Sequence, residues 1–74
     1  MRSAIFRHKV EADTPAARLF YPPENPELSI WIPRSVCPRR EQLESPNNAP
    51  HPLTKITVED WWVEKHAHLD HYFS

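Results

Sequence analysis

Metal-ligating residue types crowd one short string of the sequence, His66-Ala67-His68-Leu69-Asp70-His71. Imidazole nitrogens and carboxylate oxygens are usual zinc ligands in proteins. On a helix that continues through this string, His66 and Asp70 lie at positions i and i+4, and His68 and His71 at i and i+3, so each pair can chelate a metal ion. The simpler interpretation is a polar helix end, where the helix dipole favours cationic side chains. We favour the helix end and keep four metal candidates, which are His66, His68, Asp70 and His71.

The order H-x-H-x-D-H is similar to the metal-binding signature of metallo-β-lactamase-fold hydrolases. That resemblance implies a dinuclear zinc site that activates water. In that fold the motif follows a buried strand and further ligands lie downstream. Here the preceding residues have a helical pattern, and only Tyr72, Phe73 and Ser74 follow. We therefore expect neither hydrolase activity nor a cofactor.

Cys37 is the single cysteine, so no internal disulfide can form. Arginines near it in sequence, Arg34, Arg39 and Arg40, favour the thiolate, which is the form that acts as a nucleophile or metal ligand. The sequence positions no histidine beside it, however, so we expect a buried or half-buried thiol. An unpaired thiol fits a reducing compartment, and we expect the protein in the cytoplasm of a host cell.

Basic and aromatic residues in the first half of the chain form the best candidate for a partner-binding surface. They are Tyr21, Trp31, Arg34, Arg39 and Arg40. Aromatic and arginine side chains are frequent anchors of protein–protein interfaces. The same residue types suit single-stranded nucleic acid, because bases stack on rings while arginine meets phosphate. The net charge of −1 argues against nucleic acid, so a larger protein is the favoured partner and nucleic acid remains an alternative.

The absence of glycine excludes several classes of enzyme. The chain has 74 residues, nine prolines and no glycine. Walker loops, dinucleotide-binding turns and G-x-S-x-G elbows all need a residue without Cβ at a tight turn. A chain of this length also buries one small core, which leaves little room for an enclosed active site. No window approaches the 18 apolar residues of a membrane span, so we expect a non-enzymatic protein without a membrane partner.

Hydrophobic periodicity predicts a single small α+β domain over residues 1–74. The predicted strands are at about residues 4–12, 17–21, 28–32 and 53–56, and the predicted helix is at about 58–69. They would form an antiparallel sheet of three to four strands, packed by this one C-terminal helix. The proline-rich residues 34–52 are predicted to be a long connector of extended or irregular chain.

The predicted helix has a start signal and an apolar stripe. Thr57 and Asp60 fit the pattern in which a hydroxyl and an acid satisfy the first main-chain N–H groups. Trp61 and Trp62 lie about 100° apart on a helix, so the pattern alone does not say which one is buried. We expect Trp31 and Trp61 to be core or half-buried anchors. The alternative is that Trp31, Trp62 or Tyr21 is exposed for a partner.

Two stretches resemble a family of short, largely uncharacterised proteins of bacteriophages and prophages. One is Trp31-Ile32-Pro33-Arg34-Ser35, similar to a W-I-P-[KR]-S element, and the other runs from Ile56 to Lys65, similar to an I-x-V-x-x-W-x-x-x-K helix. The chain departs from the pattern at Ala67, where the family usually has glycine. The resemblance implies a small sheet with a terminal helix and names no activity.

These observations lead to one main hypothesis and two alternatives. The main hypothesis is a non-enzymatic, phage-type protein-binding module that modulates a host or phage enzyme by occupying its surface. The first alternative is a single-stranded nucleic-acid-binding module that uses overlapping residues. The second is a metal-binding protein that uses the C-terminal histidine string.

Overall fold

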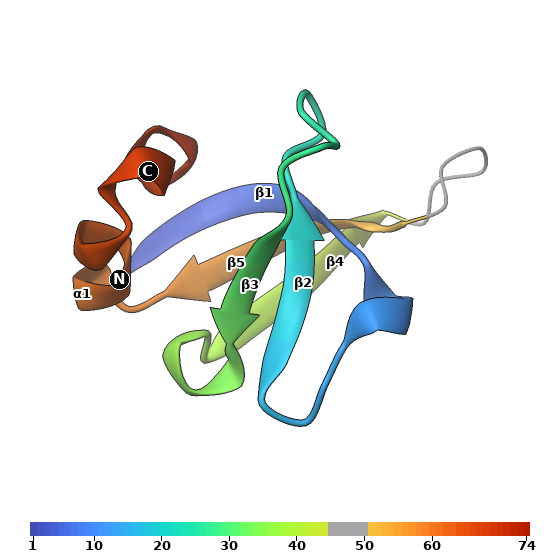
Figure 1. Cartoon of the computed structure of the whole chain (residues 1–74), viewed down its shortest axis with the longest axis horizontal. Helices are drawn as coiled ribbons and strands as arrows, with labels where there is room; N and C mark the ends of the chain where they lie inside the picture. Colours follow the sequence, from blue (N-terminus) through green and yellow to red (C-terminus); the bar gives the residue numbers. More distant parts are fainter. Residues whose placement is uncertain (45–50) are drawn as a thin grey trace.

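The computed structural model describes residues 1–44 and 51–74, and within them the chain forms a five-stranded antiparallel sheet (Figure 1). The strands are β1 (Arg2–His8), β2 (Ala17–Tyr21), β3 (Ile30–Pro33), β4 (Arg39–Glu44) and β5 (Leu53–Val58). One α-helix, α1 (Asp60–Lys65), and three 3-10 turns, η1 (Val10–Ala12), η2 (Arg34–Val36) and η3 (Ala67–Tyr72), complete the described elements. None of these helices is long and apolar enough to span a membrane.

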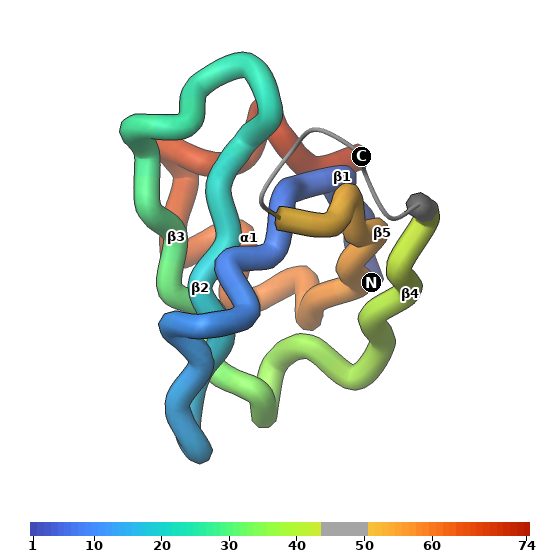
Figure 2. Tube along the Cα trace, turned by 90° about the vertical axis from the view of Figure 1, so that its right-hand side faces the viewer, coloured from blue at the N-terminus to red at the C-terminus, as the bar shows by residue number. Residues whose placement is uncertain are grey.

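The strand order is β3-β2-β1-β5-β4, so β3 and β4 are the two edges of the sheet. Figure 2 shows these edges on opposite sides of the molecule, with η2 in the segment that leads from one to the other. The prediction of an α+β chain with an antiparallel sheet and one C-terminal α-helix is confirmed. The predicted strand number of three to four is wrong, because the described residues form five.

The extra strand, β4, lies inside the segment 34–52 that was predicted to be a connector of extended or irregular chain. β4 pairs with β5 from Arg39↔Thr57 to Glu44↔Leu53, with a register irregularity between Gln42 and Glu44. Its sequence is polar and has no β-branched residue, so neither propensity nor alternation marks it as a strand. Pairing with β5 therefore determines its conformation. The part of the predicted connector at 45–50 lies outside the described residues.

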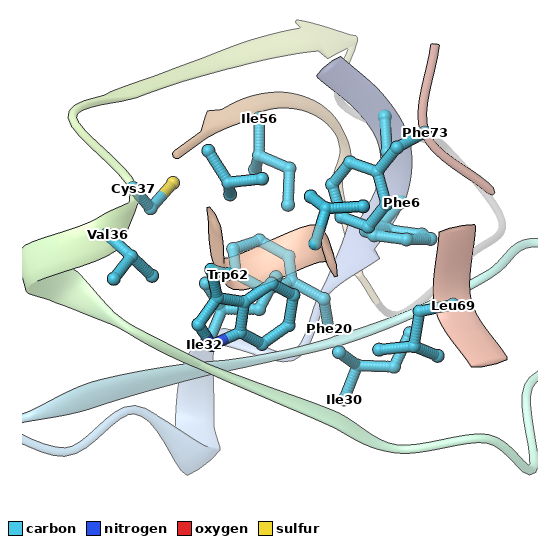
Figure 3. Packing of buried hydrophobic residues seen from close by; sticks show 13 residues of the cluster. Phe6, Phe20, Ile30, Ile32, Val36, Cys37, Ile56, Trp62, Leu69 and Phe73 are labelled. Carbon is cyan, nitrogen blue, oxygen red and sulfur yellow. The ribbon is translucent and has the colours of Figure 1, made fainter. Parts of the chain in front are cut away.

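The core lies between one face of the sheet, here called the inner face, and the C-terminal elements. Alternate residues of the central strand β1 and of its neighbour β5 are buried, such as Phe6 and Ile56. Side chains alternate between the faces of a strand, and residues opposite each other in an antiparallel pair share a face. Figure 3 shows Phe6, Phe20 and Ile56 in one cluster with Trp62 of α1. The fully packed tryptophan is therefore Trp62, which is 3% exposed.

Trp31 and Trp61 are not core residues. The expectation that both are core or half-buried anchors is therefore wrong. Trp31 is 48% exposed and Trp61 is 51% exposed. Trp31 lies opposite Leu19 on the outer face of the sheet, while Ile30 and Ile32 of the same strand point into the core. Trp61 lies on the solvent side of α1, with Lys65 Nζ 5.8 Å from its ring centroid.

The C-terminal helix is shorter than predicted at both ends. At its start, Thr57 belongs to β5 and pairs with Ser3, and the N-cap residue is Glu59 without a side-chain capping bond. At its end, the main-chain N–H of His66 donates to Val63, three residues back, instead of continuing the α-helical pattern. The chain then continues as η3. The predicted helix at 58–69 is therefore one short α-helix followed by a 3-10 turn.

The segment after η3 returns to the first strand. The main-chain N–H of Ser3 donates to Ser74 at 3.2 Å, and that of Ser74 donates back to Ser3 at 2.8 Å. Arg2 adds an ion pair and hydrogen bond to the carboxylate of Asp70. Leu69 and Phe73 are held over the inner face by these bonds and complete the core.

Candidate functional site

The histidine string does not form a metal centre in this structure. Asp70 is bonded to Arg2, and the ring of His66 is stacked on Trp62 with 4.1 Å between centroids. His71 packs against the ring of Tyr72 with 4.0 Å between centroids. No group of three or more His, Cys, Asp or Glu residues within 1–44 and 51–74 is arranged to hold a metal ion. The expected i, i+3 and i, i+4 chelating pairs need an α-helix through residue 71, and the α-helix ends at Lys65.

The five predicted partner-binding residues do not form one surface. Trp31 lies on β3, whereas Arg39 and Arg40 lie on β4 at the opposite edge. Tyr21 Oη is bonded to Nδ1 of His51 at 2.7 Å, on the outer face of the sheet. Arg39 and Arg40 also point to opposite faces, because Arg40 is opposite the buried Ile56 and Arg39 is not. Trp31 therefore belongs to one candidate site and Arg34 and Arg40 to another, while Tyr21 and Arg39 belong to neither.

The first candidate site is a groove beside the free edge of β3. It has a volume of about 190 Å³ and lies between β3 and the C-terminal elements. Its apolar and aromatic walls come from Leu28, Ile30, Trp31, Trp62 and Leu69, and its polar walls come from Ser29, His66 and His68. We call it the β3 groove. Apolar walls with a few polar groups are typical of sites that take a side chain of a ligand.

The main chain of Trp31 faces outward along this edge. Arg34 N–H donates to Ala16, which identifies 16↔34 as a hydrogen-bonded pair at the end of the β2–β3 ladder. Hydrogen-bonded and non-bonded pairs alternate in an antiparallel ladder, so Leu19↔Trp31 is a non-bonded pair. The N–H and C=O of Trp31 therefore point away from β2, and no backbone partner meets them in the described part of the chain. Pro33 is also at a non-bonded position. An N–H there would point away from β2, so the β2–β3 ladder loses no hydrogen bond through this proline.

The second candidate site is a polar cluster at the end of β1, which we define as His8, Asp13, Arg18, Arg34 and Arg40. His8 is on the inner face and is 1% exposed. Its Nε2 lies 2.8 Å from Oδ1 and 3.0 Å from Oδ2 of Asp13, and its Nδ1 lies 3.1 Å from Nη1 of Arg40. A guanidinium group only donates, so Nδ1 accepts and the imidazole proton is on Nε2, from which it is donated to Asp13.

Local structure explains how Asp13 reaches His8. The prediction extended the first strand to residue 12, but β1 ends at His8 and the chain turns through η1. The N–H of Asp13 donates to Val10, which closes this turn and brings the carboxylate back to the imidazole. A buried imidazole needs such a partner, since an unpaired buried polar group costs about 1–3 kcal/mol. The turn after β1 thus supplies the partner that the buried imidazole needs.

Two further arginines complete the polar cluster. Arg34 Nε donates to the carbonyl of Thr14 at 3.0 Å, and its Nη2 lies 3.9 Å from Asp13. Arg18 is on the inner face, and its Nε is buried without a hydrogen-bond partner among the described residues. Burial lowers the pKa of Arg18 from its usual value, and the nearby charges of Arg40 and Arg34 lower it further. Arg18 therefore lies close enough to Arg34, Arg40 and Asp13 to interact with their charges.

A cavity of about 270 Å³ opens beside the polar cluster. His8 and Arg40 form part of its wall, together with Val10, Gln42 and Thr54. Arg34 and Arg40 are among the residues predicted from the sequence, whereas His8, Asp13 and Arg18 are not. The available signal was the alternation of the first strand, which places His8 on the same face as Phe6 and so marks it as a buried polar group in need of a partner.

Cys37 is buried at the margin of the core, as expected, and is 6% exposed (Figure 3). Its Sγ lies 3.3 Å from the carbonyl oxygen of Arg39. Burial raises the pKa of the Cys37 thiol, and the opposing effect of Arg18 is smaller. Desolvation of the thiolate therefore outweighs the opposing effect of the neighbouring arginines on this pKa.

No protein-family model, no curated protein and no solved structure matches this chain. The resemblance to phage and prophage proteins stays a prediction.

Proposed function

We propose that the protein is a non-enzymatic binding module that takes an extended segment of a larger protein as an additional strand along β3. The observation that carries the proposal is the outward-facing main chain of Trp31 beside the β3 groove. An added strand would bond to the Trp31 N–H and C=O, and its alternate side chains would enter the β3 groove. Main-chain bonds supply affinity in this mode, and the groove supplies selectivity.

The residues around Trp31 suit this role. The exposed indole offers apolar area next to the open main chain, and aromatic anchors are frequent at interface hot spots. Trp62 is fixed by the core and forms a rigid wall of the groove, so little side-chain entropy is lost on binding. The opposite edge is less suited to an added strand, because β4 has a register irregularity and exposed charges at Arg39, Arg40 and Glu41.

The single-stranded nucleic-acid alternative has weaker support. It needs rings and arginines that track one strand together, and the candidate rings and arginines are on different faces and edges of the sheet. The metal alternative lacks an assembled ligand set in the described residues. A protein partner at β3 therefore remains the proposal with the most structural support.

The test compares three variants as bait in nuclease-treated cell lysate. Trp31→Pro removes both the indole and the outward N–H, whereas Trp31→Ala removes the indole alone. Proline is tolerated on an edge strand where its nitrogen faces outward. Trp61→Ala is the matched control, since this tryptophan is equally exposed but does not line the β3 groove.

We expect one protein, captured by the wild type and by Trp61→Ala, to be weakened by Trp31→Ala and lost with Trp31→Pro. Amide shifts of the labelled wild type with that protein should then map to residues 29–33 and to the groove. Capture that survives Trp31→Pro would contradict binding along β3. Proteins that disappear on nuclease treatment would favour the nucleic-acid alternative.

A further inference from the structure

The polar cluster holds more positive charge than its own residues neutralise. Arg18, Arg34 and Arg40 contribute three cations, and Asp13 is the carboxylate among them. His8 contributes no charge, because its Nδ1 accepts from Arg40 and its Nε2 proton is donated to Asp13. An ensemble with two excess positive charges is complementary to a dianion.

Part of this excess positive charge belongs to Arg18, which is partly buried. Its Nε is buried and has no partner among the described residues, although buried polar groups in proteins are almost always paired. Arg34 cannot serve as the acceptor for Arg18 Nε, because a guanidinium group is a cation that only donates. Arg34 is also already bonded to Thr14 and close to Asp13. An acceptor from outside the cluster that carried negative charge would reduce the repulsion of Arg18 with Arg34 and Arg40.

The position of Arg40 shows where such an acceptor would enter. Its Nη1 bonds to the buried His8, and the residue is otherwise exposed along the cavity beside the cluster. The cavity of about 270 Å³ is larger than one water molecule and is lined by further polar side chains, Gln42 and Thr54.

We propose that the cavity beside the polar cluster binds a dianionic phosphate group, held by Arg40 in the cavity wall, attracted by the charges of Arg18 and Arg34, and oriented by the His8–Asp13 pair. Phosphate matches the excess of two charges, and its oxygens accept the several N–H groups that guanidinium groups present. The His8–Asp13 pair keeps Arg40 in position, so both are positioning residues. This site is at the end of β1 and is separate from the β3 groove.

The experiment titrates inorganic phosphate into labelled protein at neutral pH and constant ionic strength. The amide resonances of Gln42 and Thr54 are the primary readout, because both residues line the cavity. We expect saturable shifts of these resonances, with changes at the imidazole of His8 and at the side-chain N–H groups of Arg40. A parallel titration with adenosine 5′-monophosphate distinguishes free phosphate from a phosphate ester: tighter binding of the ester assigns the cavity to an esterified group.

Variants separate a specific site from general attraction. Arg40→Gln should weaken phosphate binding by at least about tenfold, because a charge-assisted bond to an oxyanion is lost. Arg39→Gln removes the same charge from the neighbouring residue, which points to the outer face, and should leave binding within about twofold. Both residues are exposed, so both variants are expected to fold.

The outcomes are distinct. Saturable binding that Arg40→Gln weakens and Arg39→Gln does not would support the site. Equal losses in the two variants would show non-specific attraction and overturn it. The absence of saturable shifts at Gln42 and Thr54 with either phosphate or the ester would also overturn it. Strand addition along β3 is tested by Trp31→Pro, so either proposal can fail without the other.

Discussion

The imidazole Nδ1 of His66 lies 2.8 Å from the main-chain carbonyl oxygen of Trp62, and the two rings are stacked. In a continuing α-helix that oxygen would accept from the main-chain N–H of His66. That N–H donates to Val63 instead, so a side chain takes the place of a main-chain bond. The chain leaves the α-helix at this point and can return along η3 to β1.

Replacing His66 should therefore destabilise the protein although the residue is near the surface. His66→Ala removes both the stacking and the bond to Trp62, and we expect the free energy of unfolding to fall by about 1 kcal/mol. Urea denaturation followed by tryptophan fluorescence measures this value. His68→Ala is the control, because His68 is exposed and has no hydrogen bond of this kind. Equal effects of the two substitutions would contradict the proposed cause of the helix end.

The inner face should be sensitive to the loss of one methyl group. Ile56 is 0% exposed at the centre of the core, and Ile5 on the adjacent strand is 49% exposed on the outer face. Ile56→Val should lower the free energy of unfolding by about 1 kcal/mol. Ile5→Val should change it by less than about 0.5 kcal/mol. Chemical denaturation of both variants tests which faces of β1 and β5 are buried. Similar losses of unfolding free energy in the two variants would contradict this assignment.

The pair His8–Asp13 should contribute strongly to stability. Asp13→Ala leaves the buried Nε2–H of His8 without an acceptor, and we expect a loss of about 2 kcal/mol. Asp13→Asn keeps an acceptor oxygen and should cost less. Glu11→Ala is the comparison, because Glu11 bonds to His51 in an exposed pair, which is worth little in water. Denaturation midpoints at neutral pH give the order of stability of the three variants. A loss of stability in Glu11→Ala as large as that in Asp13→Ala would refute the strong contribution of the His8–Asp13 pair.

The buried thiol gives a pH dependence of known sign. Burial raises the pKa of Cys37 in the folded state. Below the ordinary thiol pKa, both the folded and the unfolded chain keep the proton, and stability is unaffected. Above it, the unfolded chain loses the proton while the folded chain retains it, so the free energy of unfolding falls as the pH rises.

The measurement compares urea unfolding of the wild type and Cys37→Ala at neutral pH and at a pH above the ordinary thiol pKa. The wild type should lose more stability over this interval than the variant. Parallel losses would show that Cys37 ionises equally in both states. The native thiol should also react slowly with a thiol reagent and rapidly after unfolding.

The sequence predicts the central part of the fold well. The prediction for β2, residues 17–21, matches its observed bounds, because strong strand formers lie between a turn at Asp13-Thr14-Pro15 and the break at Pro22-Pro23. Ile30 and Ile32 are buried and Trp31 is exposed, which is the alternation that strand geometry imposes. Local pattern and tertiary structure agree in these segments.

Elsewhere tertiary pairing overrides the local pattern. β4 has a polar sequence and becomes a strand through β5, which no local rule indicates. The helix end depends on the contact between His66 and Trp62, which a helical pattern does not reveal. The same limit applies to the polar cluster. Arg34 and Arg40 stand out as cations in the sequence, but their meeting with Arg18 depends on strand order, which the sequence does not state.

The two edges of the sheet also differ in how far they allow molecules to join one another. Continuous fibrils need two receptive edges per molecule, so that each copy pairs on both sides. Here β4 is charged and irregular, and the main chain of Trp31 on β3 is open. A molecule with one receptive edge can pair with one other copy through that edge, so edge-to-edge association stops at a dimer. Self-association through β3 would therefore produce a closed dimer that competes with any partner strand, and would not lead to aggregation.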